Sequence, residues 1–393
     1  MTPSARVQAA IELLDSILEA ATNKGAPADR LISEYFKARR YAGSKDRRAV
    51  RELVYRAIRL CGPRPASGRA AMLAVAQHDK EVAPLFDGST HGPPAIGPDE
   101  KPAKTGIAVS WLAAKLTASG VEPEVARSLL GRAPLDIRVN TLKAERSTIE
   151  LPEEGEHLSA SNAVRFPSGT NIDQWPAFRE GKIEIQDLGS QWVCEAVGAQ
   201  SSEVIVDLCA GAGGKTLAIA SNVKNSATLI AADTDKRRLG NLAPRAARAG
   251  ASVDHTVLLD PGKELEALSP WLGKADRVLV DAPCSGSGTW RRNPEGRWRL
   301  DKAELERLSE LQDHVLNTGA QLVKPGGTLV FVTCSVFDEE GAHRVDAFLD
   351  RHPGWQALPA DIPVGEARGK GTRMTPLRDG TDGFFVAILQ SSC

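Results

Sequence analysis

Two cysteines stand directly after apolar segments of the chain. Cys284 follows residues 277–280 in the motif Pro-Cys-Ser, and Cys334 follows residues 328–332 in the motif Thr-Cys-Ser. In an open parallel sheet, ligands bind at the carboxyl ends of the strands, so both thiols are expected to face one crevice. A thiolate in such a crevice can act as a nucleophile toward carbon. The pair therefore indicates covalent chemistry at thiol groups.

A glycine-rich turn indicates a ligand site at the same edge of the sheet. It reads Asp207-Leu208-Cys209-Ala210-Gly211-Ala212-Gly213-Gly214-Lys215-Thr216, and its glycines let the backbone approach a ligand at a helix N-terminus. A phosphate loop fits its last three residues but needs glycine where Cys209 stands. A nucleoside-binding turn needs a carboxylate after the next strand, and Asp233 stands there, 22 residues past Gly211. A nucleoside cofactor is favoured, with a phosphate loop and a purely structural turn as the alternatives.

Two thiols beside a methyl donor have a specific chemical use. Carbon 5 of cytosine is a poor nucleophile, but a thiolate that adds at carbon 6 makes the ring an enamine able to attack an electrophilic methyl group. The covalent adduct must then lose the carbon 5 proton before the thiolate can leave. Asp281 could hydrogen-bond the base, and Lys215 could assist from the glycine loop. Spacing alone does not rank Cys284 and Cys334 as nucleophile.

These motifs closely resemble those of the two-cysteine RNA cytosine-5 methyltransferases of the Sun or Fmu type, and most of all the bacterial ribosomal RNA small-subunit methyltransferase B proteins. The resemblance implies an α/β fold with a doubly wound, mostly parallel seven-stranded class I methyltransferase sheet, and S-adenosyl-L-methionine as cofactor. It covers residues 107–389 and rests on the segments 207–216, 232–239, 281–294, 333–340 and 382–385.

The resemblance also assigns roles to single residues. It implies that Cys334 is the nucleophile and that Cys284 helps to release the product. Asp281 and Lys215, proposed above from their chemistry, are the other two predicted catalytic residues. By analogy with DNA cytosine-5 enzymes the Pro-Cys cysteine, Cys284, would be the nucleophile, but the second strand-end cysteine favours the RNA family. The implied cofactor-binding residues are Cys209, Ala210, Gly211, Ala212, Gly213, Gly214, Lys215, Asp233, Arg238, Asp260 and Asp281.

The sequence departs from the family pattern in two places. Ala212 replaces a proline that is common in the glycine loop, a change expected to relax the turn without removing a contact. The N-terminal region is shorter than the NusB-like helical domain of many bacterial members, which leaves the target less certain than the reaction. Asp260 has an alternative interpretation as an ordinary strand-end residue in a Pro-Gly turn.

The formal net charge of −1 conceals an uneven distribution of charge. Residues 36–69 hold eleven Lys or Arg against two acids, which gives +9, while the other 359 residues sum to −10. One-sided basic runs favour contact with nucleic acid phosphates, although a solvated helix face is the alternative. The RNA-binding residues predicted in this run are Arg39, Arg40, Lys45, Arg47, Arg48 and Arg51.

A second basic stretch, residues 290–299, follows Cys284. It places Arg291, Arg292 and Arg297 between two tryptophans, a pattern that suits stacking on and clamping an unpaired nucleotide, unless the tryptophans belong to the core. The target base must be unstacked to reach a thiol, so a single-stranded loop or an accessible hairpin is expected.

The elements that must position these residues follow from periodicity and composition. Short apolar runs such as 204–206 and 228–232 alternate with helix-length segments, as in a parallel sheet covered on both faces. We predict a basic helical RNA-binding region over residues 1–85, a Pro/Gly linker over 86–106, a small α+β connecting subdomain over 107–200, and a methyltransferase domain over 201–393.

Composition excludes several other classes of protein. No apolar run approaches the roughly 20 residues that span a bilayer, and the first residues lack an export signal, so a cytoplasmic protein without a membrane partner is expected. Six cysteines without a C-x-x-C pair predict neither disulfides nor a metal site. We expect a monomer that methylates ribosomal RNA or a small-subunit assembly intermediate. The alternatives are a tRNA cytosine-5 methyltransferase, an inactive RNA-binding assembly factor, and a DNA or protein methyltransferase; the Thr-Cys-Ser motif argues against the last.

Overall fold

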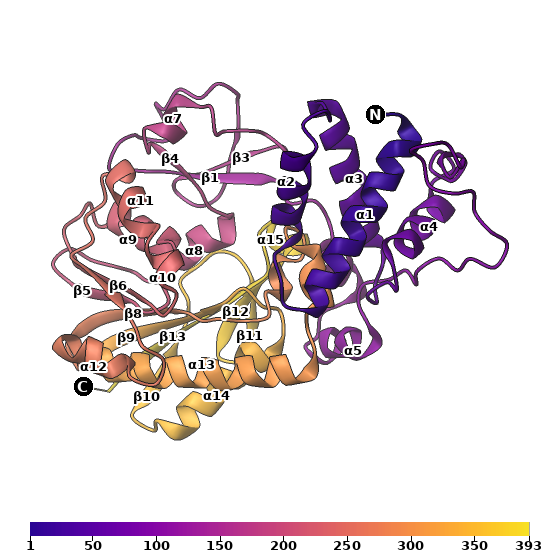
Figure 1. Cartoon of the computed structure of the whole chain (residues 1–393). Helices are drawn as coiled ribbons and strands as arrows, with labels where there is room; N and C mark the ends of the chain where they lie inside the picture. Colours follow the sequence, from indigo (N-terminus) through magenta and orange to yellow (C-terminus); the bar gives the residue numbers. More distant parts are fainter. Residues whose placement is uncertain (393) are drawn as a thin grey trace. The chain divides into compact units, whose positions relative to one another are not determined.

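The computed structural model describes residues 1–392, which fall into two compact units (Figure 1). The helical unit combines Met1–Gly131 with the later segment Thr289–Asp301, and the sheet unit comprises Arg132–Gly288 and the chain from Lys302 onward. This division differs from the predicted boundaries. Residues 107–131 group with the helical region rather than with a connecting subdomain, and part of the predicted catalytic region, residues 289–301, joins them.

The first four helices of the helical unit pack around one core. In its first helix the buried positions Val7, Leu14 and Leu18 recur at helical spacing, and the Thr2 hydroxyl caps the helix by accepting a hydrogen bond from the Ala5 N–H at 3.2 Å. No helix among residues 1–392 is long and apolar enough to cross a membrane. The unit contains α1 (Pro3–Thr22), α2 (Ala28–Ala38), α3 (Ser44–Leu60), α4 (Gly68–His78), α5 (Ser110–Ala118), α6 (Pro123–Ser128) and the 3-10 helices η1 (Ala83–Leu85) and η4 (Pro294–Trp298).

Residues 86–106, predicted as a linker, instead pack onto the helical unit. They lack a helix, as their prolines and glycines require, but their polar groups are paired with the helices. Arg69 on α4 donates to Glu100 at 2.5 Å, the Ser4 hydroxyl donates to Asp87 at 2.6 Å, and the N–H of residue 103 bonds the helix at 2.9 Å. These contacts tie the segment to the unit along its length.

The segment Thr289–Asp301 corrects the prediction for Arg297. Its side chain is 2% exposed, and its guanidinium donates to the carbonyl oxygens of Ile58 at 2.5 Å and Cys61 at 2.8 Å, and also to that of Pro294. The last carbonyls of a helix lack partners within it, and Arg297 supplies donors to the end of α3. The prediction that Arg297 clamps RNA is therefore wrong. Arg291 is buried as well, and so are both tryptophans of the segment, Trp290 and Trp298.

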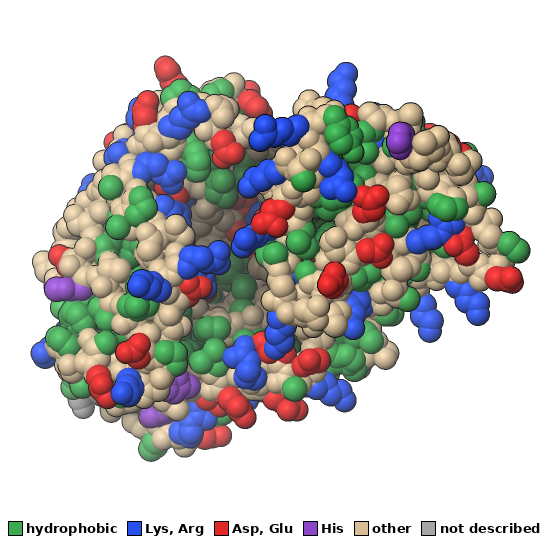
Figure 2. All heavy atoms as spheres, viewed as in Figure 1, with side chains coloured by type: hydrophobic (Ala, Val, Ile, Leu, Met, Phe, Trp, Pro, Cys, Tyr) green, Lys and Arg blue, Asp and Glu red, His purple; other side chains and the backbone are tan. Residues whose placement is uncertain are grey.

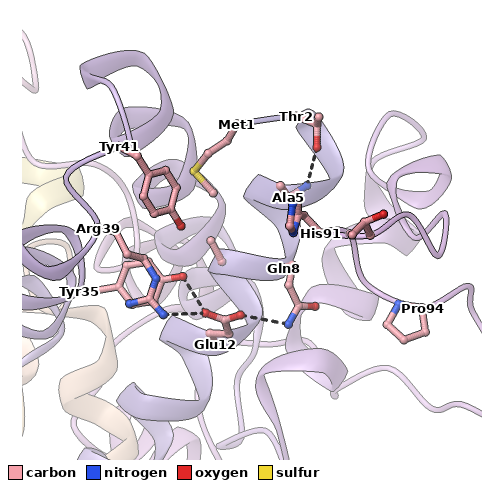
Figure 3. Close-up of a pocket in the computed structure, with 13 residues that line it drawn as sticks. Met1, Thr2, Ala5, Gln8, Glu12, Tyr35, Arg39, Tyr41, His91 and Pro94 are labelled. Atoms are coloured by element: carbon pink, nitrogen blue, oxygen red, sulfur yellow. Dashed lines mark hydrogen bonds and ion pairs between the residues drawn. The ribbon is translucent and has the colours of Figure 1, made fainter.

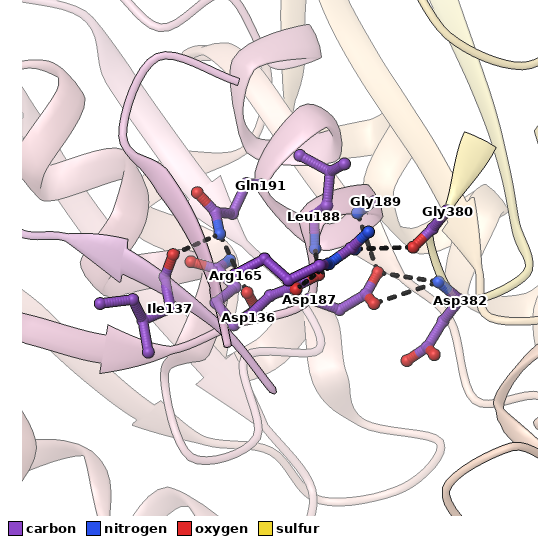
Figure 4. Close-up of polar contacts among 10 residues, drawn as sticks. Asp136, Ile137, Arg165, Asp187, Leu188, Gly189, Gln191, Gly380 and Asp382 are labelled. Carbon is purple, nitrogen blue, oxygen red and sulfur yellow. Dashed lines mark hydrogen bonds and ion pairs between the residues drawn. The ribbon is translucent and has the colours of Figure 1, made fainter. Parts of the chain in front are cut away.

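The sheet unit begins with a small antiparallel sheet in the order β2-β3-β1-β4. Asp136 on this sheet is 1% exposed and connects it to the rest of the unit (Figure 4). Its carboxylate accepts two hydrogen bonds from Arg165, at 2.7 and 2.8 Å, and one from the Leu188 N–H. Asp187 in turn accepts from the N–H of Asp382 at 3.0 Å, near the C-terminal end of the chain. The elements are β1 (Leu135–Val139), β2 (Glu156–His157), β3 (Ala163–Phe166), β4 (Ile183–Ile185) and α7 (Pro176–Arg179).

The main sheet confirms the predicted doubly wound α/β fold. Its central pairs β7-β6, β6-β5, β5-β8 and β8-β9 are parallel, and β13 adds antiparallel to β9. Among the described residues it has nine strands rather than the seven predicted, because short antiparallel strands extend the β13 edge. They are β5 (Val204–Asp207), β6 (Thr228–Asp233), β7 (His255–Leu258), β8 (Ala275–Asp281), β9 (Val323–Thr333), β10 (Trp355–Leu358), β11 (Glu366–Arg368), β12 (Gly371–Met374) and β13 (Phe384–Ser391).

Helices cover both faces of this sheet, as continuous apolar strands require (Figure 1). On β8, Val278 and Val280 enter the core shared with Leu316 of α13, while Leu279 enters the opposite core with Trp192 of α8. The helices are α8 (Leu188–Ala196), α9 (Gly214–Asn222), α10 (Lys236–Leu239), α11 (Leu242–Ala249), α12 (Glu264–Leu268), α13 (Lys302–Leu322), α14 (Ala342–Arg351) and α15 (Pro376–Asp379), with 3-10 turns η2 (Ser269–Trp271), η3 (Ser287–Thr289) and η5 (Asp338–Glu340).

The strand order reverses between β5 and β8. From β5 the chain runs outward through β6 and β7, and then returns to place β8 on the other side of β5. In open α/β sheets the ligand crevice lies at such a switch point, beyond the carboxyl ends of the strands. The glycine loop after β5 and the cysteine loop after β8 both leave the sheet at this point.

Candidate active site

A cavity of about 630 Å³ lies at the carboxyl ends of β5, β6, β8 and β9. Its lining brings together Cys209 after β5, Asp233 at the end of β6, Asp281 at the end of β8 and both strand-end cysteines. Apolar side chains, among them Leu259 and Leu311, complete the wall. These strand-end cysteines and carboxylates, singled out in the sequence, therefore line one cavity.

The two strand-end thiols are in contact. The Sγ atoms of Cys284 and Cys334 are 3.3 Å apart, and both side chains are half-buried. The hydrogen bond with Cys334, together with burial, raises the pKa of Cys284 well above its ordinary value. Cys284 therefore stays a neutral thiol and can donate a hydrogen bond to its neighbour.

A half-buried cation lies next to this pair. The Lys215 ammonium donates to Asp281 at 2.5 Å. Burial alone would lower the pKa of Lys215, but the negative charge of Asp281, with the nearby Cys194 and Cys334, raises it above its ordinary value. Lys215 therefore remains charged beside Asp281.

The glycine loop is held in place by Asp233. One carboxylate oxygen of Asp233 accepts from the Gly211 N–H at 2.7 Å, and the other accepts from the Asp235 N–H at 2.7 Å. Gly213 adopts a left-handed conformation, with φ of +82°, as the residue before α9. The loop thus brings the N-terminus of α9 toward the end of β6.

The predicted cofactor residues fall into three groups. Asp233, Arg238, Asp281 and Cys209 line the cavity. The rest of the loop forms its backbone support: the Ala210 N–H donates to the end of β6 at 3.0 Å, and the Ala212 carbonyl accepts from α11 at 2.7 Å. Gly214 begins α9 and precedes Lys215. Asp260 is exposed and outside the cavity lining, although the residues on either side of it line the cavity.

Comparison with known proteins decides the family. The family model described as 16S rRNA methyltransferase RsmB/F matches residues 195–390. A ribosomal RNA small subunit methyltransferase B from Vibrio cholerae is 30% identical over 354 residues, which cover 87% of this chain and 76% of that protein. The chain belongs to the 16S rRNA methyltransferase RsmB/F family. The resemblance inferred from the motifs is thereby confirmed.

Two further RsmB/F comparisons define the extent of the likeness. A probable ribosomal RNA small subunit methyltransferase B from Synechocystis sp. is 34% identical over 273 residues, 66% of this chain and 60% of that protein. The chain thus spans about 60% of the length of the first curated relatives it matches. The crystal structure of the protein PH0851 matches with a TM-score of 0.76 and 26% identity, and covers 100% of both chains.

In this RsmB/F family member, sequence reasoning missed Glu340 and Gln312. Glu340 is 0% exposed and accepts hydrogen bonds from Ser285, Ser335 and Gln312. The Gln312 side chain also donates to the Pro283 carbonyl at 2.9 Å. The only available signal was the acid at the end of the segment 333–340, and nothing in its spacing from the cysteine shows which donors surround it.

Backbone hydrogen bonds show how the motif segment 382–385 contacts the cysteine loops. The Gly383 N–H donates to the Gly288 carbonyl at 2.8 Å, and the Gly288 N–H donates to the Cys334 carbonyl at 3.0 Å. A Cβ atom on Gly288 would lie 2.0 Å from the Gly383 oxygen, so the close approach needs glycine. The loop before β13 therefore supports the loop that carries Cys334.

Proposed function

We propose that this chain is an S-adenosylmethionine-dependent RNA cytosine-5 methyltransferase that acts on small-subunit ribosomal RNA. The main support is the pair of Cys284 and Cys334 thiols, whose Sγ atoms are 3.3 Å apart. Their cavity is also lined by Asp233, a strand-end carboxylate of the kind that binds the ribose of a nucleoside. Family membership supports the ribosomal target, because the matching relatives are named as small-subunit rRNA methyltransferases.

The residues present fit the cofactor. Each oxygen of Asp233 accepts one main-chain N–H, which leaves lone pairs for ribose hydroxyls on the cavity side. Leu259, Pro261 and Val315 offer an apolar surface to an adenine ring, and Arg238 lies against the glycine loop near the ribose position. When bound, S-adenosylmethionine supplies an electrophilic methyl group.

The electrostatics support Cys334 as the nucleophile. The neutral Cys284 thiol lies 3.3 Å from the Cys334 Sγ atom and can donate a hydrogen bond to it, which leaves Cys334 as the member of the pair that attacks. A Cys334–carbon 6 bond would form, and the electron pair of the carbon 5–carbon 6 double bond would then attack the methyl carbon, whose bond to the sulfonium sulfur would break to release S-adenosylhomocysteine. Loss of the carbon 5 proton to a base then restores that double bond and expels the Cys334 thiolate, the step that Cys284 assists. We assign to Asp281, which lines the cavity, the hydrogen bond from the exocyclic amine.

The basic run on the helical unit supplies the surface for RNA. Figure 2 shows Lys and Arg side chains over the region of α2, and Arg40, Lys45, Arg47, Arg48 and Arg51 are exposed. Exposed cations of this kind contact phosphates without reading sequence. We propose that this surface holds the RNA backbone.

Arg39 differs from the other members of the run. It lines a second cavity, of about 970 Å³, in the helical unit (Figure 3). Its guanidinium stacks 3.6 Å from the centroid of the Tyr35 ring and donates to Glu12 at 3.3 Å. Because Glu12 offsets this charge, we assign Arg39 a smaller share of phosphate binding than its exposed neighbours. Arg292, which is half-buried, keeps the predicted role from the second basic stretch.

A methyl-transfer assay tests the proposal. The purified chain is incubated with S-adenosylmethionine and either small-subunit rRNA, small-subunit assembly intermediates or tRNA, and 5-methylcytidine is measured by nucleoside mass spectrometry and located by bisulfite sequencing. We expect 5-methylcytidine in the rRNA samples and none with the Cys334→Ala variant. Modification of tRNA alone would replace the ribosomal target, and RNA binding without methyl transfer would identify an inactive assembly factor.

A further inference from the structure

The carboxylate of Glu340 is enclosed and receives four donors. Its Oε1 accepts from the Ser285 N–H at 2.7 Å and from the Gln312 amide at 3.1 Å. Its Oε2 accepts from the hydroxyls of Ser285 and Ser335, the latter at 2.6 Å. The side chain is 0% exposed, and all four donors are neutral. A buried carboxylate needs several hydrogen bonds to offset its lost hydration, and these donors provide them.

These donors are the neighbours of the two cysteines. Ser285 directly follows Cys284, and Ser335 directly follows Cys334. The residues on the other side are held as well: Gln312 binds the carbonyl before Cys284 at 2.9 Å, and the Thr333 hydroxyl donates to the Glu340 carbonyl at 3.1 Å. Glu340 and its partner Gln312 thus hold the chain on both sides of each thiol.

The direction of these hydrogen bonds makes a carboxylate necessary. The Ser285 hydroxyl already accepts from the Ser287 N–H at 3.3 Å, and the Ser335 hydroxyl accepts from the Phe337 N–H at 3.1 Å. Each hydroxyl therefore has its proton available for Glu340. A glutamine at position 340 would bring an NH₂ group against at least one donor, and a donor facing a donor in a buried site costs free energy.

We propose that Glu340 is a positioning residue of the two-cysteine centre, which fixes the separation of Cys284 and Cys334 by binding the serine that follows each of them. The inference rests on the proposed function for its catalytic meaning, but the positioning itself does not depend on methyl transfer. The Glu340 charge also contributes to the raised pKa of Cys284, after the hydrogen bond with Cys334, burial and the charge of Cys334. Glu340 thus helps to keep Cys284 protonated while Cys334 reacts.

The test measures how readily the two thiols can reach each other. Diamide oxidises neighbouring thiols: Cys284 and Cys334 each lose one hydrogen as the S–S bond forms, and diamide is reduced to the hydrazine. The rate at which this disulfide forms is followed by mass spectrometry and divided by the rate at which iodoacetamide alkylates Cys284 at the same pH, so that the ratio reports the proximity of the two Sγ atoms and not the fraction of thiolate. We expect Glu340→Gln to lower this ratio at least about tenfold, which corresponds to about 1.36 kcal/mol.

A second readout separates positioning from a general loss of structure. Alkylation of Cys284 by iodoacetamide, measured across pH, is expected to begin at lower pH in Glu340→Gln because a nearby negative charge is gone. In the methyl-transfer assay, kcat is expected to fall while KM for S-adenosylmethionine stays unchanged, because Glu340 does not line the cofactor cavity. Ser335→Ala, which removes one donor and leaves the carboxylate, should slow disulfide formation and lower kcat by less, and should leave the pH profile of Cys284 alkylation unchanged.

Glu310→Gln is the matched control. It removes the same charge from an exposed position on α13, the helix that carries Gln312, and should match the unsubstituted protein. Equal rate ratios and Cys284 pH profiles in Glu340→Gln and the control would overturn the inference, as would a loss of kcat with an unchanged rate ratio. A lower rate ratio in a protein that transfers no methyl group would support the positioning role and contradict the proposed function instead.

Discussion

Asp207, at the end of β5, has a side chain that titrates in an unusual range. It is 1% exposed; one carboxylate oxygen accepts from the Thr216 hydroxyl at 2.6 Å, and the other has no hydrogen-bond partner among the described residues. Burial raises its pKa from the ordinary value of 3.8 to about 7. The folded protein therefore binds a proton at Asp207 over a pH range in which the unfolded chain has released it.

This shift gives a prediction with a definite sign. Between about pH 4 and pH 7 the folded state binds more protons than the unfolded state, so the Asp207 contribution to stability falls as pH rises, by up to ~1.4 kcal/mol per pH unit. Asp207→Asn removes the titration and keeps the shape. We expect the free energy of unfolding of the variant, relative to the unsubstituted protein, to increase from pH 4 to pH 7 in urea titrations without cofactor. A difference independent of pH would contradict the assignment.

At the residue scale, the sequence predicts functional residues that follow strands, but it does not predict residues whose role depends on which side chains surround them. Cys284, Cys334 and Asp233 follow apolar runs, and parallel strands bring such positions to one edge. Glu340 could not be found in this way, because its role depends on where four donors point. Arg297 was misassigned for a related reason: its charge suggested a surface, but the end of α3 needed its donors.

At the element scale, the turn between β5 and α9 depends on one backbone conformation. Gly213 has φ of +82°, and a Cβ atom there would lie 2.1 Å from Leu242 on α11. We predict that Gly213→Ala lowers the free energy of unfolding by at least about 1–3 kcal/mol, the cost of forcing a side chain into the left-handed region. Urea or thermal unfolding without cofactor measures it.

Gly214 supplies the control for this prediction. It begins α9 with an ordinary φ, and a Cβ atom there would have no atom within 4 Å. Alanine is favoured over glycine in helices, so Gly214→Ala should leave stability unchanged or raise it by up to about 1 kcal/mol. If both variants lost the same stability, the turn would not depend on the conformation of Gly213.

The elements themselves were predictable to different degrees. The apolar runs 204–206, 228–232, 277–280 and 328–332 became the parallel strands of the main sheet, because strands buried on both faces carry a continuous apolar signal. The short edge strands β10 to β12 carry polar residues and gave no such signal, so the sheet has more strands than predicted. Residues 86–106 had the composition of a linker, but composition does not show that Arg69 pairs with Glu100.

At the scale of the whole molecule, the near-zero net charge results from opposite charges in different parts of the chain. Residues 36–69 carry +9, and the others carry −10. We predict that reversing Arg47, Arg48 and Arg51 to Glu weakens RNA binding at least tenfold at low salt and flattens its dependence on salt concentration, because fewer counterions are released. Binding isotherms at several salt concentrations measure both effects.

A matched triple reversal tests whether position matters more than net charge. Lys224, Lys263 and Lys274 are exposed on the sheet unit, and changing all three to Glu alters the net charge by the same amount. We expect this control to keep most of the RNA affinity and the salt dependence. Equal losses in the two triple variants would show that the basic run is an ordinary solvated surface.

The covalent mechanism requires that the two thiols have different roles, with Cys334 as the nucleophile and Cys284 in product release. Labelled substrate RNA is incubated with S-adenosylmethionine and either Cys284→Ala or Cys334→Ala, and covalent protein–RNA adducts are resolved on denaturing gels. We predict that the Cys284→Ala adduct accumulates, because the Cys334 bond forms and is not released, and that Cys334→Ala forms no adduct. The reverse pattern would exchange the two roles, and the absence of an adduct in both variants would contradict the covalent mechanism.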